Sequence, residues 1–345
     1  MRLLITTQTV NQDDPVLGFF HAWIEEFAKR YEQVTVICLY EGRHSLPANV
    51  RVYSLGKEKG AAHPLRYALR FKLLAWKFRH DYDAVFVHMN PEYIVIAGLL
   101  WRLMHKRIAL WYLHKSVSLR LRAAVLLADV VLSASRESFR LPTKKLHIVG
   151  HGIDFSQYTY QTPRAHIDSP RFITVGRITP AKGIHDIFDA LKVAGLNQFS
   201  YDLYGGPAVK SDAAYLQGLI TRAAKEFPNA HITFHGPVPP HRIPEVLRGH
   251  DLFLHASRGT GSIDKVVLES LAAGVLVLSM SEAFEALLAP HGLYASGAED
   301  FAHLIAVFPS RPDREAVAQT LSADVRAHHA LPALIIRITG LLNSK

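Results

Sequence analysis

The chain has 345 residues, of which 49% are hydrophobic and 20% are charged, with a formal net charge of +9. This length suits two domains, each with its own core, and the ordinary composition excludes a disordered or low-complexity chain. Because Cys38 is the only cysteine, an intramolecular disulfide and a thiolate metal cluster are both excluded. The start MRLLITTQTV lacks the apolar stretch of a signal peptide, and Tyr93–Leu100 is too short to span a membrane. We therefore expect a cytoplasmic protein.

In the first half, short apolar and β-branched runs alternate with amphipathic segments, which predicts an α/β domain with a parallel sheet. The predicted strands are Leu3–Thr7, Val34–Tyr40, Val50–Ser54, Ala84–His88, Ile108–Leu113, Val130–Ser133 and His147–Val149. The predicted helices between them lie near Phe19–Arg30, Pro64–Phe78, Tyr93–Met104 and Ser118–Leu127.

A polar segment with two prolines, Ser156–Pro170, separates this first series of strands and helices from a second series of the same kind, and it is the predicted linker. The strands of this second series are predicted at Phe172–Val175, Tyr201–Tyr204, Ile232–Phe234, Leu252–His255, Val275–Ser279 and Leu293–Tyr294. Two doubly wound sheets in one chain predict a cleft between domains, with ligands at the carboxyl ends of the strands.

The positive charge is confined to one half of the chain. Residues 1–155 hold 22 Lys and Arg against 13 Asp and Glu, whereas the remainder holds 17 of each. Lys59–His80 and Tyr93–Ala128 contain six basic residues each and no acidic residue. Such faces attract anionic lipid or a polyanionic acceptor, or they are ordinary solvated helix faces. Since no recognition module is visible, a nucleic-acid partner is not expected.

The helix Leu65–Phe78, LRYALRFKLLAWKF, mixes basic and aromatic residues. This character predicts an interfacial helix that associates loosely with an anionic membrane. The alternative is a core-packing helix with a basic outer face.

The first candidate binding segment is Phe172–Gly183, FITVGRITPAKG. A strand ends at Gly176, which lets the backbone turn sharply beside a ligand. Arg177 and Lys182 follow on the same short loop, and two cations there can neutralise a diphosphate. An ordinary surface loop with two cations is the alternative reading of this segment alone.

The second candidate segment is Gly259–Gly274, GTGSIDKVVLESLAAG, where a small-residue loop runs into a helix. Free backbone N–H groups at such a start suit phosphate or sugar oxygens. Glu269 lies among apolar residues of this helix, where a carboxylate needs a partner such as ribose hydroxyls; the alternative is a glutamate that faces outward. Tyr201–Pro207, YDLYGGP, adds a strand that ends in a glycine pair at the same sheet edge.

In this order and spacing the segments resemble the retaining glycosyltransferase family 4, which has the GT-B fold. HGID at 151–154 resembles the family's NGVD-type segment, and VGRITPAKG at 175–183 resembles its VGRL–x–x–KG segment. GTGSIDKVVLESLAAGVLVL at 259–278 resembles its glutamate-motif helix. The resemblance implies two Rossmann-like doubly wound domains that face a central cleft, with a C-terminal helix that crosses back to the N-terminal domain.

The implied domains are an acceptor-binding domain at 1–155, a nucleotide-sugar-binding domain at 156–325, and a C-terminal helix at 326–345 that packs on the first domain. The resemblance implies that Arg177 and Lys182 hold the donor diphosphate and that Glu269 contacts the nucleotide ribose. The family's first motif glutamate is replaced by Gly261, so Ser262, Asp264 or Lys265 would contact the transferred sugar with the local backbone. The implied donor-binding residues are Gly176, Arg177, Lys182, Gly205, Gly261, Ser262, Asp264, Lys265, Val266 and Glu269.

In the N-terminal half the resemblance points to three further residues. His114 follows the strand IALWYL, where members often carry a histidine near the reacting centre, and it joins Arg177 and Lys182 as an expected catalytic residue. His88 ends the strand AVFVH and is a second candidate. Gly18, in DDPVLGFF, resembles a degenerate form of the family's N-terminal glycine loop.

The implied activity is that of a retaining hexosyltransferase, EC class 2.4, that moves a sugar from a nucleotide-diphosphate sugar to a glycan, lipid-linked or polyanionic acceptor. The family's leaving-group chemistry needs no bound metal, so no cofactor is expected. The alternatives are a nucleotide-sugar epimerase of the same fold and a non-catalytic nucleotide-sugar-binding protein. Peripheral association at the inner face of the membrane would refine the cytoplasmic assignment.

Overall fold

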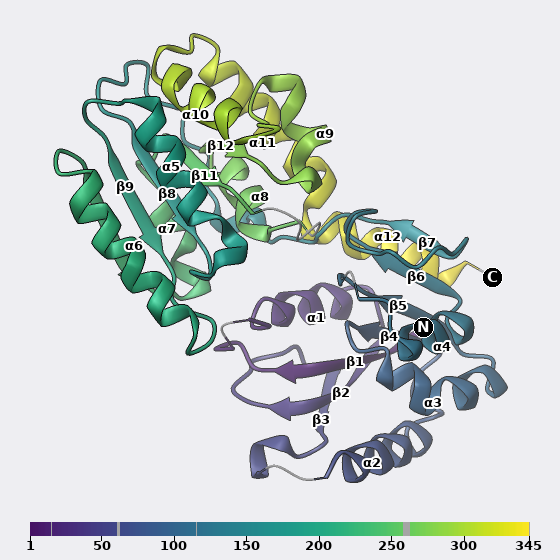
Figure 1. Ribbon diagram of the computed structural model, residues 1–345. Coiled ribbons are helices and arrows are strands. Elements are labelled where there is room, and N and C mark those ends of the chain that lie inside the picture. The colour runs from purple at the N-terminus through teal and green to yellow at the C-terminus, as the bar shows by residue number, and fades with distance from the viewer. Residues whose placement is uncertain (15, 61–62, 115, 258–262, 345) are drawn as a thin grey trace. The chain divides into compact units, whose positions relative to one another are not determined.

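The computed structural model describes residues 1–14, 16–60, 63–114, 116–257 and 263–344. The chain divides into two compact units, each built on one parallel sheet (Figure 1). Unit 1 comprises Met1–Asp154 together with His328–Lys345, and unit 2 comprises Phe155–Ala327.

Unit 1 contains a seven-stranded sheet in the order β3-β2-β1-β4-β5-β6-β7. Its strands are β1 (Arg2–Val10), β2 (Gln33–Glu41), β3 (Val50–Ser54), β4 (Ala84–His88), β5 (Arg107–Trp111), β6 (Val130–Ser133) and β7 (Leu146–Ile148). All neighbouring pairs are parallel. The central strands are buried on both faces, which explains why they read as continuous apolar runs in the sequence.

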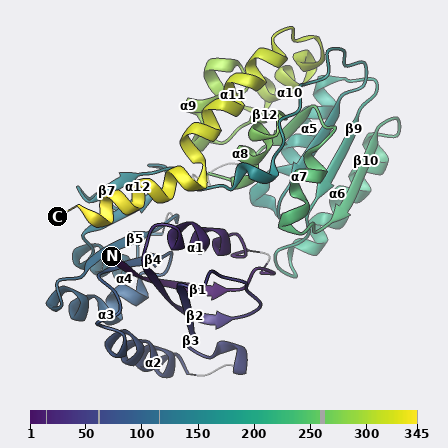
Figure 2. The same ribbon diagram turned by 180° about the vertical axis from the view of Figure 1, so that it is seen from behind.

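Helices cover both faces of this sheet. The helices of unit 1 are α1 (Phe20–Ala28), α2 (Pro64–Lys77), α3 (Glu92–Leu103), α4 (Leu119–Leu127) and α12 (Leu331–Asn343). From β1 the chain adds β2 and β3 on one side of the sheet, and it then adds β4 to β7 on the other side of β1. Because the crossover connections are right-handed, α1 lies on one face of the sheet and α2, α3 and α4 lie on the other face. Accordingly α3 packs beside α2 and α4, while α1 packs beside α12 (Figures 1 and 2).

The C-terminal helix α12 belongs to unit 1 because it buries an apolar stripe there. Leu334, Ile335 and Ile338 are fully buried, and α12 contacts α1 and β5. Gly152, in the HGID segment, adopts φ +74°, and a Cβ there would overlap Leu334 and Trp23. Trp23 also donates an Nε1–H hydrogen bond to the carbonyl of Gly152 (2.9 Å). The HGID segment is therefore fixed between the first and last helices of this unit.

Unit 2 contains a five-stranded sheet in the order β10-β9-β8-β11-β12. Its strands are β8 (Arg171–Val175), β9 (Ser200–Tyr204), β10 (His231–Gly236), β11 (Leu252–His255) and β12 (Leu276–Ser279). Its helices are α5 (Ile184–Ala194), α6 (Asp212–Glu226), α7 (Ile243–Leu247), α8 (Lys265–Ala272), α9 (Glu285–Leu288), α10 (Ala298–Val307) and α11 (Arg314–His329). Helix α5 packs beside α6 and α10, and α8 packs on β11 and β12.

The predicted strands match the observed ones to within three residues at each end, except for one that is absent. Leu293–Tyr294 forms no strand and contributes only an isolated bridge from Tyr294 to Ser279. Strand β5 ends at Trp111 rather than Leu113, and β12 begins at Leu276 rather than Val275. A two-residue run is too short to be distinguished from a turn by its apolar character. None of the helices in the described ranges combines the length and apolarity needed to cross a bilayer.

Candidate functional site

The predicted donor residues of unit 2 follow neighbouring strands of one sheet. Gly176 follows β8, Gly205 follows β9, and α8 begins at Lys265, in the connection from β11 to β12. Because β9, β8, β11 and β12 are adjacent and parallel, the segments after them meet at one edge of the sheet. The carboxyl edge of a doubly wound sheet is where this architecture binds ligands.

Glycines bring the ends of β8, β9 and β10 into close contact. Gly176 (φ +153°) and Gly205 (φ +148°) both adopt positive φ. Gly205 lies directly against Gly176, since a Cβ at Gly205 would overlap the carbonyl oxygen of Gly176. The Ile178 N–H donates to Gly206 O (2.8 Å) and the Gly205 N–H donates to Gly236 O (2.7 Å). The three strand ends therefore form a tight backbone surface with no side chain at its centre.

Arg177 and Lys182 sit at the two ends of the short loop that follows Gly176. Arg177 is exposed, and it forms no ion pair with any residue that the structure describes. Lys182 ends the 3-10 turn Pro180–Lys182 and is largely buried, with its side chain 19% exposed. A Cβ at the following residue, Gly183, would overlap the carbonyl of Ala256, so this glycine allows the loop to pack against the end of β11.

Lys182 belongs to a polar chain that also includes His255, Asp264 and Ser279. The Asp264 Oδ2 atom lies 2.6 Å from Lys182 Nζ and 2.7 Å from His255 Nε2. On the other side of the ring, His255 Nδ1 lies 2.8 Å from the Ser279 hydroxyl, which accepts the Ser281 N–H (3.0 Å). A neutral His255 with its proton on Nε2 satisfies every one of these contacts.

This polar chain of side chains keeps the Asp264 carboxyl ionised. Burial raises the pKa of the Asp264 carboxyl, but the hydrogen bond from His255 and the Lys182 ammonium outweigh that effect and hold the pKa far below the ordinary value. A carboxylate that shares two donors can release one of them when a competing anion arrives. Lys182 is thus held in place by an internal counter-ion that a diphosphate could replace.

Glu269 lies one turn into α8 and is 1% exposed. Its Oε1 atom is 3.0 Å from Lys265 Nζ, an i,i+4 ion pair, and it accepts no hydrogen bond from any other described residue. A buried carboxylate with a single cationic neighbour can accept further hydrogen bonds. Glu269 is therefore a site where ligand hydroxyl groups would be favourable hydrogen-bond donors.

Two predicted donor residues, Gly261 and Ser262, lie outside the described residues. Val266 is in the first turn of α8, half-buried, and its carbonyl accepts a hydrogen bond from the Ser270 hydroxyl (2.8 Å). The structure thus brings Lys182, Asp264, Lys265 and Glu269 to one region, with Lys182 bonded to Asp264 and Lys265 paired with Glu269.

A cavity of about 420 Å³ lies beside the glycine-bearing strand ends of unit 2. It is lined by Tyr204, which directly precedes Gly205, and by His235 and Pro237 from the end of β10. Tyr204 and His235 are stacked, with ring centroids 4.3 Å apart and planes 6° apart. Asp202 accepts from His235 Nε2 (2.5 Å) and fixes the orientation of that ring. Both rings of the stacked pair line the cavity.

In unit 1 the loop that follows β1 requires a glycine at position 18. A Cβ at Gly18 would lie 2.6 Å from the Asp14 carbonyl oxygen. The Asp14 carboxylate also accepts the Leu17 N–H (2.7 Å), which tightens the same turn. Gly18 therefore shapes this loop through close backbone packing.

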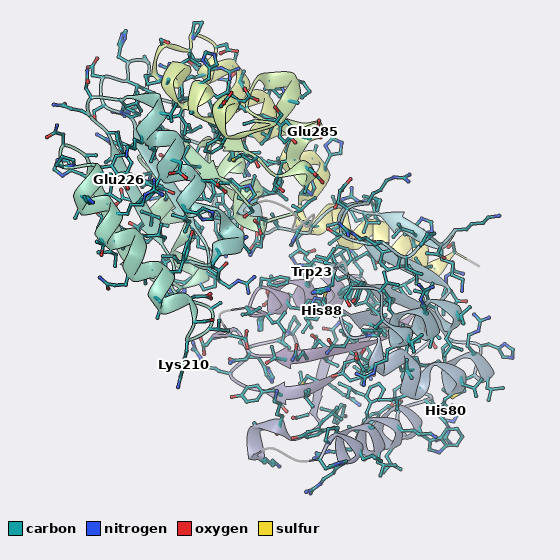
Figure 3. The ribbon with its side chains drawn as sticks, in the orientation of Figure 1. Trp23, His80, His88, Lys210, Glu226 and Glu285 are labelled. Atoms are coloured by element: carbon teal, nitrogen blue, oxygen red, sulfur yellow. The ribbon has the colours of Figure 1, made fainter. Side chains whose placement is uncertain are left out.

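His88, which ends β4, is buried among aromatic side chains and is 2% exposed. Its ring is stacked on Phe20 with centroids 3.9 Å apart, and its Nδ1 lies 3.1 Å from the Thr7 hydroxyl. Figure 3 shows it beside Trp23, whose ring centroid is 6.2 Å away. Burial lowers the pKa of His88 to about 3, so the ring is neutral. This placement favours a packing role over contact with an acceptor.

His114 lies three residues beyond the end of β5 and is exposed. The Ser116 N–H donates to His114 Nδ1 (3.0 Å), which leaves the ring proton on Nε2 when the histidine is neutral. The Gly18 loop, His88 and His114 follow β1, β4 and β5, which are adjacent strands, so they lie along the same edge of the seven-stranded sheet.

The sequence interpretation missed His255 and Ser279, which complete the polar chain through Asp264. Both residues end adjacent parallel strands, β11 and β12, and they are paired in register. Their strand-end position was visible in the sequence, but with 20 histidines in the chain that position alone did not distinguish His255. Only the register of β11 against β12 brings the two side chains together.

Two parallel α/β sheets of this kind, one of seven strands and one of five, define the GT-B fold. Comparison with known proteins agrees. Residues 159–287 match the model of the family described as Glycosyl transferases group 1. A comparison with curated protein sequences finds no match.

Several solved structures share the fold over nearly their whole length. Anabaena HepE, solved in complex with UDP and glucose, has a TM-score of 0.75 at 18% identity, with 99% of each chain covered. The sucrose-phosphate synthase of Thermosynechococcus elongatus has a TM-score of 0.72 at 15% identity, with 98% of each chain covered. A glycosyltransferase from Rickettsia africae has a TM-score of 0.70 at 12% identity, with 99% of each chain covered.

Proposed function

We propose that the protein is a nucleotide-sugar-dependent glycosyltransferase whose donor site lies at the carboxyl edge of the five-stranded sheet. The observation that carries this proposal is the grouping of Lys182, Asp264 and Glu269 beside the glycine ends of β8 and β9. These residues fall within the segment that matches the glycosyl transferase model. A diphosphate needs cations, and a ribose needs a buried hydrogen-bond acceptor; this edge supplies both.

A UDP-linked hexose is the proposed donor. HepE was solved with UDP and with UDP-glucose, which supports uridine as the first base to test. The cavity lined by Tyr204 and His235 supports stacking of a flat base against an aromatic wall. Glu269 would accept hydrogen bonds from the ribose hydroxyls in addition to its ion pair with Lys265.

The proposed reaction retains the anomeric configuration, as in family 4. Negative charge grows on the departing diphosphate, so the main task of the protein is electrostatic stabilisation of that leaving group. Arg177 is exposed and can swing onto the diphosphate, whereas Lys182 is already held in position by Asp264. When the diphosphate replaces this contact, Asp264 keeps its hydrogen bond to His255. Lys182 therefore changes partner while the Asp264 carboxylate retains a hydrogen-bond donor.

We propose that unit 1 binds the acceptor, a glycan or a lipid-linked or polyanionic molecule. A cavity of about 570 Å³ lies among the N-terminal ends of α2, α3 and α4. Its walls are mostly apolar, with Leu55, Phe71 and Ile96 among them, whereas Asn90 and Arg120 supply polar groups. This lining supports an acceptor that carries an apolar part. His114, with Nε2 directed away from its bond to Ser116, would act near the reacting centre.

Titration calorimetry with UDP, GDP, ADP and dTDP tests the donor proposal. One nucleotide, expected to be UDP, should bind the wild-type protein. Glu269→Gln keeps the size of the side chain but removes its charge, and it should weaken binding by about 10- to 100-fold because a hydrogen bond to a charged group contributes about 1.5–3 kcal/mol. Arg177→Ala should weaken it similarly. Lys225→Ala removes an exposed cation of α6 from the same unit and should bind like the wild type.

Equal binding by Glu269→Gln and the wild type would refute the placement of the ribose. If no nucleotide binds a well-folded protein, the proposal as a whole is wrong. Tight UDP binding without hydrolysis or transfer from UDP-sugars would favour a non-catalytic binding protein. Conversion of a UDP-sugar to its epimer without an acceptor would favour an epimerase.

A further inference from the structure

Three neighbouring helices of unit 1, α2, α3 and α4, expose an unusual amount of apolar surface. Among the residues that the structure describes, eighteen large apolar side chains are exposed, and nine of them lie on these helices. These nine are Leu65, Leu69, Leu73, Trp76, Val95, Leu99, Leu103, Leu119 and Leu126. Scattered exposed apolar residues are ordinary, but a concentration of this kind marks an interaction surface.

The exposed residues form stripes along the helices. On α2, Leu65, Leu69 and Leu73 are spaced by four residues and Trp76 follows after three more, so they share one face. On α3, Val95 and Leu103 lie one turn to either side of Leu99. The opposite faces of both helices are buried against the sheet, through residues such as Phe71 on α2 and Trp101 on α3. These outward stripes are therefore additional to the apolar residues that the fold itself needs.

Basic side chains accompany the stripes. The three helices carry seven Lys and Arg residues, all exposed: Arg66, Arg70, Lys72, Lys77, Arg102, Arg120 and Arg122. Their one acidic residue, Glu92, is paired with Arg120 (3.1 Å). Apolar residues flanked by cations are typical of helices that lie in the interface of an anionic membrane.

We propose that α2, α3 and α4 form a surface, here called the docking face, that binds an anionic phospholipid membrane. The leucine stripes and Trp76 would enter the headgroup layer, and the flanking Lys and Arg side chains would contact lipid phosphates. A second copy of the chain fits this face poorly, because a two-fold contact would bring two sets of cations together, and among the described residues only Arg102 and Arg120 of each set have acidic partners. The inference concerns how unit 1 is held at a surface and does not depend on the donor site.

Trp76 provides a direct probe of membrane binding. It is 50% exposed, whereas the other three tryptophans, Trp23, Trp101 and Trp111, are at most 1% exposed. Insertion into a bilayer should shift the fluorescence of Trp76 to shorter wavelength and protect it from aqueous quenchers. The full-length protein is mixed with vesicles of phosphatidylcholine, with or without phosphatidylglycerol, at low salt. We expect the shift and cosedimentation only with the anionic vesicles, and Trp76→Phe should abolish the shift while the protein still sediments.

Substitutions on the face distinguish specific docking from general charge attraction. The double variant Leu69→Glu with Leu99→Glu should weaken vesicle binding by about tenfold or more, because affinity scales with the apolar area that is buried. Lys72→Glu with Lys77→Glu should weaken it as well. Ile336→Glu is the matched control, since Ile336 is similarly exposed (54%, against 61% for Leu69) but lies on α12, which covers the other face of the sheet. It should bind like the wild type. Circular dichroism establishes that each variant is folded.

The proposal is overturned if the wild type fails to bind anionic vesicles at low salt, or if the Leu69 and Leu99 double variant binds as well as the wild type does. It is also overturned if light scattering shows a wild-type dimer that this double variant converts to a monomer, because the face would then join two copies. Nucleotide binding is measured separately, so failure here leaves the donor site untouched.

Discussion

Two histidines at equivalent places in the two sheets show how differently the units use their carboxyl edges. His88 ends β4 in unit 1 and His255 ends β11 in unit 2, and both are buried, at 2% and 5% exposure. His88 is stacked on Phe20 and bonds to the Thr7 hydroxyl. His255 bonds to the carboxylate of Asp264, which is paired with Lys182. The same fold position is thus a packing position in one unit and part of a charged chain in the other.

Gly152 of unit 1 and Gly205 of unit 2 show a related difference. In unit 1, a side chain at Gly152 would meet Leu334 and Trp23, which are side chains. In unit 2, a side chain at Gly205 would meet the backbone carbonyl of Gly176. Side chains can move aside, whereas paired strand ends cannot. The edge of the second sheet is therefore rigid where it would face a ligand, and its ion pairs are the part that can rearrange.

The largest effect on stability should come from Gly205→Ala. The added Cβ overlaps the Gly176 carbonyl, and the residue must keep a positive φ, so steric overlap and backbone strain together should cost about 3–5 kcal/mol of unfolding free energy. Gly176→Ala is the control: its φ is also positive, but no atom lies within 4 Å of the new Cβ, so only the backbone strain of about 1–3 kcal/mol remains. Urea unfolding measures both. Equal losses would mean that the strand ends can separate.

The next largest effect should be on turnover, in Lys182→Ala. Removal of one positioned group that stabilises developing negative charge lowers kcat by about 10²–10³-fold. The measurement is the rate of UDP release from the UDP-sugar that the protein uses. Lys225→Ala, which removes an exposed cation from α6, should leave kcat unchanged. A Lys182→Ala variant with normal kcat would mean that Lys182 serves only as the counter-ion of Asp264.

Asp264→Asn tests the polar chain that joins Lys182, Asp264 and His255. The pKa of Asp264 is depressed in the folded protein, so its charge contributes stability above its unfolded pKa of 3.8, and this stability is lost as the pH falls through the folded pKa. The variant should be less stable than the wild type by about 1–3 kcal/mol at pH 7. The difference should shrink only below about pH 4. Urea unfolding at pH 7, 5 and 4 checks this, and a difference that already vanishes at pH 5 would contradict the assigned direction.

The smallest effect should come from His88, and it should occur at higher pH. The pKa of His88 is about 3 in the folded protein, against an ordinary value of 6.5. Between pH 3 and pH 6.5, the unfolded chain therefore binds a proton at His88 that the folded chain does not. Stability therefore decreases as the pH falls below 6.5, by about 1.4 kcal/mol per pH unit from this one group. His88→Asn keeps an acceptor for Thr7 but cannot titrate. Its unfolding free energy should fall less steeply than that of the wild type from pH 6.5 to 5, and parallel slopes would mean that His88 titrates normally.

The sequence determined much of the local structure of this protein. Strand runs such as Ala84–His88 and Leu252–His255 were predicted to the residue, because strands buried on both faces must be continuously apolar. It also predicted the grouping of Arg177, Lys182, Asp264 and Glu269, since those residues follow strands or begin a helix at positions that a doubly wound sheet brings to one edge. The predicted strand at Leu293–Tyr294 was wrong because two residues are too few to show a hydrophobic periodicity.

Tertiary structure alone decided which of these polar residues became partners. Nothing in the order of residues distinguishes His88 from His255, since each follows three apolar residues at the end of a strand. The difference comes from neighbours far away in the chain: Phe20 and Thr7 surround one ring, whereas Ser279 and Asp264 bond to the other. The exposed stripes of α2, α3 and α4 were also settled only in three dimensions, because an apolar residue on a helix is assigned to the core or to the surface by what packs against it. Burial and strand register set those neighbours, and both depend on contacts between residues that are distant in sequence.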